Sequence, residues 1–265
     1  MPGAPRVASF GYHEVTNDPR SSGFQRPGAL PFTLTPRAFE LQLEAIAAGP
    51  LAPTLVTGVD LDRPGDHLLL TFDDGGKSAL HAADELSGRG WRGHFFVITG
   101  RVGTRTFLGW EEIRYLKSCG HVVGSHSHTH PDIFRELAPR AMRDEWRRSA
   151  DLLGERLGEP CVAASVPGGE SSPAVLRTAA EEGLQFLFTV EPELRPRRVG
   201  GCWILGRHLI KKYMTPAQVG ELVRFRGWAR ALATRRIKNL ARRAVPPLYR
   251  RLVAIRTGEW RQELE

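Results

Sequence analysis

Two short polar stretches contain the residues best suited to chemistry. Three histidines, His126, His128 and His130, fall within five residues in "GSHSHTHPD". Two adjacent aspartates, Asp73 and Asp74, follow the apolar run "HLLLTF". Imidazole nitrogens and carboxylate oxygens are common protein ligands of zinc. A dense histidine cluster together with paired carboxylates therefore predicts metal-assisted chemistry.

The spacing limits which of these side chains can share one metal ion. Residues i, i+2 and i+4 share a face of a strand, and residues i and i+4 share a face of a helical turn. The sequence therefore allows either His126 with His130, or all three histidines. Adjacent carboxylates repel each other unless a positive charge compensates them, and a divalent cation would do so. If two histidines and one carboxylate bind the metal, the second carboxylate is free to act as a general base.

Ordinary structural roles for these residues stay open at this point. Paired aspartates also suit a turn after a strand, and the histidines also suit a solvated polar loop. A phosphate loop is excluded, although "GKS" follows the aspartates, because Thr71 stands where the upstream glycine of that motif is required.

Apolar runs alternate with stretches of helical period up to about residue 220. This alternation predicts parallel strands joined by right-handed crossovers, either as a barrel or as an open sheet. Residues 14–34 are rich in Pro, Gly and Ser and are expected to form a long loop. The candidate strands are "RVASFGYH", "HLLLTFDD", "GHFFVIT", "HVVGSH", "CVAASVP", "LQFLFTV" and "CWILGRHLI". The candidate helices begin at Thr35-Pro36 and cover about 77–88, 109–118, 138–157 and 172–183.

Three polar clusters each follow a candidate strand: "TFDDGG", "GSHSHTH" and "SVPGGE". The carboxyl ends of parallel strands meet on one face of an α/β fold. The three clusters are therefore expected to build one site.

At these residues the sequence resembles the polysaccharide deacetylase family, the NodB-homology carbohydrate esterases. "TFDDG" at 71–75 resembles the first family motif and "HSHTH" at 126–130 the second, and the resemblance covers roughly residues 6–210. It implies a distorted (β/α)7 barrel, which we assign to residues 1–214, and removal of N- or O-acyl groups from sugars with the help of a metal. Residues 215–265 are then a basic helical extension.

The resemblance also implies roles for individual residues. Asp73 would be the general base, and Asp74, His126 and His130 would bind a divalent metal, Zn²⁺ in the first place and Co²⁺ or a similar ion as the alternative. His128 falls at a variable family position and is given no ligand role. Ser127 would brace the loop.

Other family motifs are matched in part. "SVPGG" at 165–169 aligns with the third motif and implies that the Gly168 N–H faces an oxyanion. Ser165 stands where the family often has Arg, and "FLFTVEPEL" lacks the Asp and Trp of the fourth motif. "ILGRHLI" replaces the Leu-x-His of the fifth, so His208 is the expected proton donor, with Arg207 as an alternative charge stabiliser. His13 in "GYHEV" is expected at the rim of the site.

Positive charge is concentrated near the C-terminus. The formal net charge is +8, yet eleven Arg or Lys and no Asp or Glu lie between Glu221 and Glu259, so the rest sums to about −3. From about Thr215 the pattern is helical with an imperfect apolar stripe. Two interpretations stay open: a helix packed on the barrel with a solvated Arg face, or a surface helix drawn to anionic lipid. Nucleic acid is not an expected partner, because no recognised binding motif accompanies the charge.

The sequence also suggests a compartment. No apolar run of about 18 residues is present, and the N-terminus lacks the features of a signal peptide. We therefore expect a cytoplasmic protein, at the inner face of the membrane if the basic helix binds lipid. The three cysteines, Cys119, Cys161 and Cys202, are widely spaced and odd in number, which favours reduced thiols.

The function predicted from these observations is a metal-dependent hydrolase that removes a small acyl group, N-acetyl above all, from a sugar of a polysaccharide, glycolipid or lipid-linked glycan. Two alternatives remain at this point: an inactive barrel that binds glycan or serves as a scaffold, and a hydrolase of a non-sugar C–N amide. The oligomeric state is left undecided.

Overall fold

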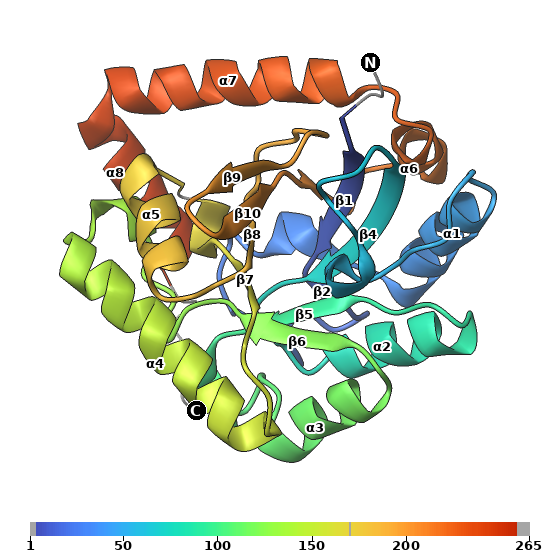
Figure 1. Ribbon diagram of the computed structural model, residues 1–265, viewed down its shortest axis with the longest axis horizontal. Coiled ribbons are helices and arrows are strands. Elements are labelled where there is room, and N and C mark those ends of the chain that lie inside the picture. The colour runs from blue at the N-terminus through green and yellow to red at the C-terminus, as the bar shows by residue number, and fades with distance from the viewer. Residues whose placement is uncertain (1–3, 170, 259–265) are drawn as a thin grey trace.

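The computed structural model describes residues 4–169 and 171–258. Its centre is a strongly curved sheet surrounded by helices (Figure 1). The strand order is β11-β1-β4-β5-β6-β7-β8-β10-β9, and neighbouring strands are parallel except for the antiparallel pair β9–β10. The strands are β1 (Arg6–Tyr12), β4 (Asp66–Phe72), β5 (His94–Val97), β6 (Val122–Ser125), β7 (Ala163–Ser165), β8 (Phe186–Phe188), β9 (Arg197–Val199), β10 (Cys202–Leu205) and β11 (His208–Leu209).

One stretch of chain joins the two ends of the sheet. β10 pairs with β8, and β11, which follows after only two residues, pairs with β1. Residues 202–209 thus serve as the last strand position of a closed ring. Each of the seven candidate strands contributes one position, so the predicted distorted (β/α)7 barrel is confirmed.

The helices form an outer layer, and some of their ends are capped as the sequence predicts. Thr35 accepts a hydrogen bond from the Ala38 N–H at the start of α1, where Pro36 occupies the first turn, as the sequence predicts. Gly158 ends α4 in a left-handed conformation, φ 72°, which glycine adopts without steric cost. The helices are α1 (Pro36–Ala47), α2 (Ala79–Gly88), α3 (Trp110–Ser118), α4 (Pro139–Leu157), α5 (Pro173–Glu181), α6 (Pro216–Val223), α7 (Trp228–Ala244) and α8 (Pro246–Thr257).

Two features differ from the sequence prediction. Residues 14–34 contain two short strands, β2 (Glu14–Val15) and β3 (Thr33–Leu34), which pair in parallel beside the main sheet. β9 adds an antiparallel edge strand that the sequence pattern did not indicate. β2 and β3 have two residues each, too few to show a period, and β9 has the sequence Arg-Arg-Val, which contains no apolar run.

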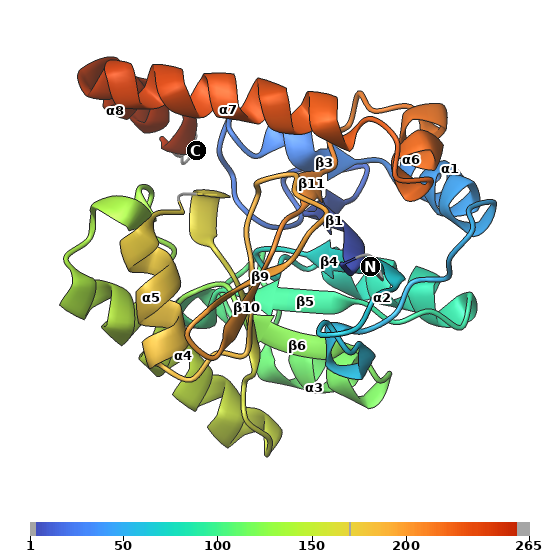
Figure 2. The ribbon, with the colours of Figure 1, turned by 45° about the horizontal axis from the view of Figure 1, so that its top comes forward.

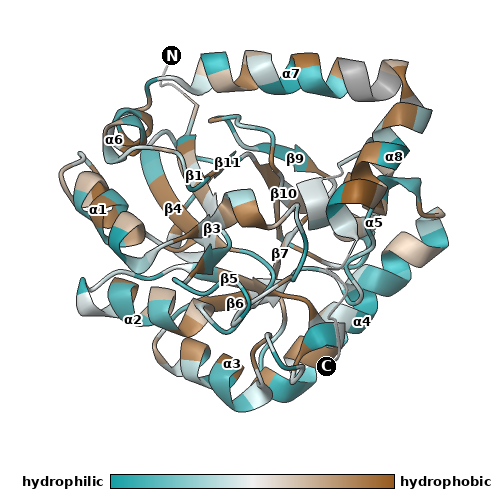
Figure 3. Ribbon diagram, turned by 180° about the vertical axis from the view of Figure 1, so that it is seen from behind, coloured by the Kyte–Doolittle hydropathy of each residue, from teal (hydrophilic) through white to brown (hydrophobic). Residues whose placement is uncertain are grey.

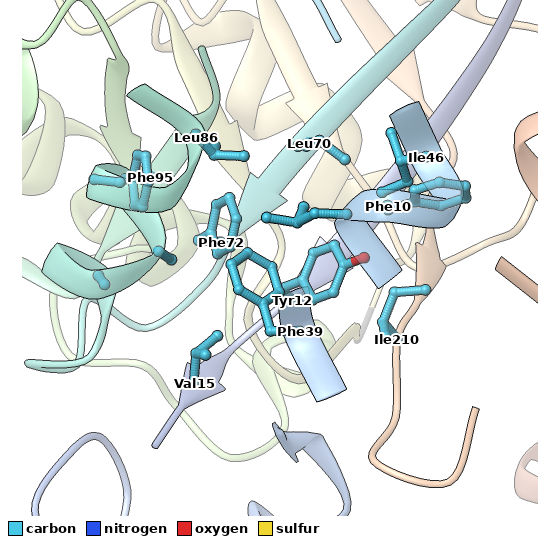
Figure 4. Close-up of a cluster of buried hydrophobic side chains, with 14 of the residues drawn as sticks. Phe10, Tyr12, Val15, Phe39, Ile46, Leu70, Phe72, Leu86, Phe95 and Ile210 are labelled. Carbon is cyan, nitrogen blue, oxygen red and sulfur yellow. The ribbon is translucent and has the colours of Figure 1, made fainter. Parts of the chain in front are cut away.

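Both faces of the sheet are covered by packed side chains. On β4, Leu70 and Phe72 point outward to the helices, whereas Thr71 points into the barrel, because neighbouring strand residues point to opposite faces. Phe72 stacks on Phe95 at 4.7 Å between ring centroids, and Tyr12 stacks on Phe72 at 5.4 Å. Figure 4 shows this outer cluster closing around the aromatic rings. Burial on both faces fixes which side chains point into the barrel.

The C-terminal helices continue from the barrel wall onto its end. α6 packs against α1, and its Val219, Leu222 and Val223 belong to the main core cluster. α7 then crosses the molecule, and α8 leaves its far end at an angle toward α5 (Figure 1). Within the described ranges, no helix combines the length and the apolar character needed to cross a bilayer. The division at residue 214 stays a prediction.

Candidate metal centre

The three predicted metal ligands lie together at the carboxyl ends of β4 and β6. One ligand atom each of Asp74, His126 and His130 lies within 4.8 Å of the other two. The Nε2 atoms of His126 and His130 lie 3.3 and 3.8 Å from the same Asp74 oxygen, Oδ1. The side chains of Asp74, His126 and His130 are 8%, 1% and 12% exposed. Two imidazole nitrogens and one carboxylate oxygen in a buried cluster fit a divalent ion such as zinc and leave coordination positions open.

The backbone at the ligands adopts rare conformations. Asp74, Ser127 and His130 have φ values of 74°, 64° and 56°, in the left-handed region that few non-glycine residues adopt. Each such residue costs roughly 1–3 kcal/mol and persists only where its surroundings hold it in place. The left-handed turns direct the ligands from two strand ends toward one point. Such concentrated backbone strain is typical of functional sites.

Hydrogen bonds fix the orientation of the His126 ring. Its Nδ1 lies 3.1 Å from the Ser165 carbonyl oxygen and 2.6 Å from Ser165 Oγ. Ser165 Oγ in turn donates to Asp73 Oδ1 at 3.0 Å. This direction of donation places one ring proton on Nδ1, so Nε2 is the nitrogen that faces Asp74 and can bind a metal once it carries no proton. A ligand histidine held in this way has the tautomer that metal binding requires.

The middle histidine takes no part in the cluster. His128 Nδ1 lies 2.9 Å from Thr99 Oγ1. Glu145 of α4 accepts hydrogen bonds from the N–H groups of His128 and Thr129 at 2.9 and 2.7 Å. Ser127 Oγ accepts the His130 N–H at 3.0 Å. The loop is therefore held both from within and from α4. Glu145 organises this loop, a role that no sequence motif indicated.

The second aspartate is held away from the ligand cluster by an arginine. Arg207 is fully buried, and its guanidinium contacts the Asp73 carboxylate through two parallel bonds of 2.7 and 2.9 Å. The same guanidinium donates to Thr71 Oγ1 at 2.9 Å and to the Thr189 carbonyl at 3.0 Å. A bidentate pair of this kind fixes both the position and the charge of the carboxylate.

The charges of the site decide the protonation of its members. Burial raises the pKa of Asp73, but the Arg207 guanidinium and His126 outweigh burial and hold this pKa below its usual range. Burial also lowers the pKa of His130 to about 4, with a contribution from His126. Burial lowers the pKa of His126, but the carboxylates of Asp73 and Asp74 outweigh burial and raise it. A neutral His130 is ready to bind a metal, whereas at His126 the metal competes with a proton.

Comparison with known families identifies this arrangement. A family model described as polysaccharide deacetylase matches residues 60–187, which include Asp73, Asp74, His126 and His130. Residues 60–187 are a polysaccharide deacetylase domain. The recognition made from the two sequence motifs is thus confirmed. No curated protein matches the chain.

Solved structures share the fold of this deacetylase domain and its surroundings. IcaB from Ammonifex degensii is 23% identical, with a TM-score of 0.67 over 83% of this chain and 99% of its own. The polysaccharide deacetylase BC0361 from Bacillus cereus is 21% identical, with a TM-score of 0.69 over 82% of this chain and 69% of its own. The Streptococcus pyogenes deacetylase PplD is 20% identical, with a TM-score of 0.67 over 84% of this chain and 99% of its own.

After the deacetylase domain, the chain that joins β10 to β11 places Arg207 and His208 on opposite faces of the sheet. Leu205 belongs to the cluster inside the barrel, so Arg207, two residues later, also points inward to Asp73. His208 points outward, where its ring contacts Trp228 edge-on at 6.0 Å between centroids. The structure therefore does not bring His208 to Asp73, and this geometry argues against the proton-donor role expected for it. Arg207 occupies the position of a charge partner for Asp73.

A further histidine, His13, interacts with the two aspartates of the candidate site. It follows β1, its ring stacks on Phe32 at 4.8 Å, and its buried Nδ1 has no hydrogen-bond partner within the described part of the chain. Burial lowers the pKa of His13, while the carboxylates of Asp74 and Asp73 act in the opposite direction. The ring thus lies within the electric field of both carboxylates. The position at the rim of the site that the sequence predicts for His13 stays a prediction.

The third cluster of the sequence, "SVPGG", also lies at the carboxyl end of the barrel. Gly168 has a φ of 58°, so a side chain there would be strained. A cavity of about 340 Å³ opens beside the next residue, Gly169, and is lined by residues of α5, β9 and α7 among others. The oxyanion contact expected of the Gly168 N–H stays a prediction.

Proposed function

We propose that this protein is a metal-dependent carbohydrate deacetylase that removes an N-acetyl or other small acyl group from a sugar of a polysaccharide, glycolipid or lipid-linked glycan. One observation carries the proposal: two Nε2 atoms face one Asp74 oxygen, while the neighbouring Asp73 is held apart by Arg207. This arrangement suits Asp74 to bind the metal and leaves the Asp73 carboxylate available for proton transfer. The family match over residues 60–187 supports the same reaction class.

Asp74, His126 and His130 would hold the metal, Zn²⁺ or a similar divalent ion. When bound, such an ion lowers the pKa of water and polarises the acyl carbonyl. Asp73 takes a proton from the attacking water as the water adds to the carbonyl carbon. The Gly168 N–H is suited to stabilise the negative oxygen of the tetrahedral intermediate. The C–N bond then breaks, and the products are a carboxylic acid and the sugar amine.

We assign the proton for the leaving amine to His13 in place of His208. The outward position of His208 and the interaction of His13 with the Asp73 and Asp74 carboxylates support this assignment. Because burial lowers the pKa of His13, its imidazolium is a stronger acid than free histidine, although less of it is protonated at neutral pH.

The position of Arg207 argues against the alternative that the protein is an inactive scaffold. Ser165 stands where the family often has Arg, which by itself suggests a damaged site. The bidentate contact of Arg207 with Asp73 supplies a guanidinium from another strand, and Ser165 links Asp73 to His126. A barrel that only binds glycan has no need for this arrangement, so the structure favours an active enzyme.

A substrate panel tests the proposal. Acetate release should be measured with the zinc-loaded protein on oligomers of N-acetylhexosamine, on O-acetylated sugars and on N-acetylated amino acids. Release from the sugars, absent in the Asp73→Asn variant, is the expected result. Release from the amino acids alone would show that the protein is an amidase of another class, and no release from any substrate by metal-loaded protein would favour the scaffold.

A further inference from the structure

The helices α7 and α8 are attached to the rim of the site through their inner faces. Trp228 of α7 is buried. Further along α7, Arg235 Nη2 donates to the Gly169 carbonyl at 3.0 Å, and Asn239 donates to Glu191 at 3.0 Å. Gly169 follows β7 and Glu191 follows β8, both at the carboxyl ends of the strands. The inner face of α7 is therefore bound to loops that surround the candidate metal centre.

α8 holds two further loops of the same rim. The Gly28 N–H donates to the Arg256 carbonyl at 3.0 Å, and Arg250 pairs with Glu136 at 3.2 Å. Gly28 lies in the segment between β2 and β3, and Glu136 lies shortly after the ligand His130. Figure 2 shows α7 and α8 lying together along this end of the barrel. Whatever binds the outer faces of these helices therefore lies close to the entrance of the site.

The outer faces carry large apolar side chains that contact little protein. On α7, Ile237 and Leu240 are 67% and 66% exposed. On α8, Leu248, Leu252 and Ile255 are 65%, 44% and 64% exposed, and their spacing of four and three residues places them on one side of the helix. In Figure 3 apolar and polar residues alternate along both helices. Exposed apolar side chains grouped in this way indicate an interaction surface.

The same helices carry a dense positive charge. Residues 228–257 contain nine Arg or Lys and no Asp or Glu, which exceeds the net charge of +8 of the whole chain. Arg235 and Arg250 pair with acidic residues of the barrel on the inner side. The side chains of Arg230, Lys238 and Arg251 are exposed. The outer surface therefore combines apolar side chains with positively charged ones.

We propose that the outer faces of α7 and α8 dock this protein on the surface of an anionic phospholipid bilayer. Apolar side chains of an interfacial helix enter the boundary between headgroups and acyl chains, and the basic side chains bind anionic headgroups. A second copy of the chain fits less well, because a symmetric contact would bring the two positive faces together. Nucleic acid would leave Leu248, Leu252 and Ile255 without apolar contacts. The inference concerns a surface outside the metal centre and holds whatever acyl group the site removes.

Docking on a bilayer has a consequence for access to the site. Loops from four strand ends contact α7 and α8, so a docked protein would present its site entrance close to the lipid surface. Glycans attached to lipid carriers would then meet the site without leaving the membrane. A freely diffusing glycan would gain nothing from this arrangement.

Vesicle sedimentation with the full-length protein tests the proposal. We expect the protein to sediment with vesicles of phosphatidylcholine mixed with phosphatidylglycerol, and to stay in solution with vesicles of phosphatidylcholine alone. The double variant Leu248→Ser/Ile255→Ser removes apolar side chains without changing charge and should lose binding. The variant Arg230→Gln/Arg251→Gln should bind roughly 30-fold more weakly, since each basic residue near an anionic surface contributes about 1 kcal/mol.

The matched control is Arg63→Gln, which removes a surface arginine, 83% exposed, in the loop that precedes β4 at the other end of the barrel. It should bind the anionic vesicles like the wild type. Thermal unfolding of each variant checks that the substituted, exposed side chains leave the fold intact. Absence of binding to anionic vesicles, or equal binding by all variants, overturns the proposal. A third result would also overturn it. Sedimentation velocity would show that the wild type is a dimer and that Leu248→Ser/Ile255→Ser is a monomer, while both bind vesicles equally.

Discussion

The pair Arg207–Asp73 gives the sharpest prediction about stability. Arg207→Met keeps the length and apolar stem of the side chain but leaves the Asp73 carboxylate, 3% exposed, without its cation. Removing one partner of a buried ion pair costs about 3–5 kcal/mol of unfolding free energy, because an uncompensated charge stays buried. Arg6 and Asp66 provide a matched control: they form a similar pair, Nε–Oδ1 2.8 Å, but on the surface. Arg6→Met should cost less than about 1 kcal/mol.

The dependence on pH separates the loss of charge from a loss of packing. In the wild type the pKa of Asp73 lies below its ordinary value, so its ionisation stabilises the fold above that ordinary value, and this contribution is lost as the pH falls through the lower folded value. In Arg207→Met only burial and weaker partners remain, so the pKa of Asp73 should rise. The deficit in stability should therefore be largest at neutral pH and shrink as acid protonates Asp73.

Urea denaturation of the metal-free proteins at neutral and acid pH measures both effects. The double variant Asp73→Asn/Arg207→Met should recover much of the stability that Arg207→Met loses, because no charge is then left buried. The reasoning is refuted if Arg207→Met costs no more than Arg6→Met, or if its deficit is the same at all pH values and is not reduced by Asp73→Asn.

Three further predictions concern the chemistry of the site. Asp73→Asn should abolish acetate release while the metal stays bound, and surviving activity would show that another group is the base. His13→Gln should lower kcat by roughly 10²–10⁴-fold, the usual contribution of a general acid or base, with metal content unchanged; a loss of metal in this variant would make His13 a ligand instead of a proton donor. His128→Ala should leave zinc affinity in a calorimetric titration nearly unchanged, because the His128 ring bonds to Thr99, and a large fall in affinity would contradict the three-residue ligand set.

Much of the barrel was predictable because its strands lie within apolar runs that alternate with stretches of helical period. The run "HLLLTF" predicts a strand, and Thr35-Pro36 predicts the start of a helix, each from a few adjacent residues. Both elements are present in the structure as β4 and α1. The pairing of β2 with β3 was not predictable. It joins residues almost twenty positions apart through two-residue strands, and only the surrounding tertiary packing makes such short pairing stable.

The metal ligands could be predicted from the sequence, whereas the charge partner of Asp73 could not. Asp74, His126 and His130 stand at motif positions with fixed spacing, so their type and order carry the information. Arg207 and His208 are neighbours at the start of β11, and only Arg207 faces the interior. Both sets of alternate positions in "CWILGRHLI" contain apolar residues, so the sequence does not say which set points inward. The choice depends on Leu205 packing inside the barrel, which only the structure shows.

The central claim is that Asp74, His126 and His130 bind a divalent metal, and metal content tests it most directly. Untagged wild-type protein and the Asp74→Ala variant should each be incubated with zinc, freed of excess ion and analysed for metal per chain by mass spectrometry. The account predicts close to one equivalent in the wild type and a marked loss in the variant, which removes the oxygen that both histidine Nε2 atoms face. An equal metal content in the two proteins, or none in either after incubation with zinc or cobalt, would contradict it.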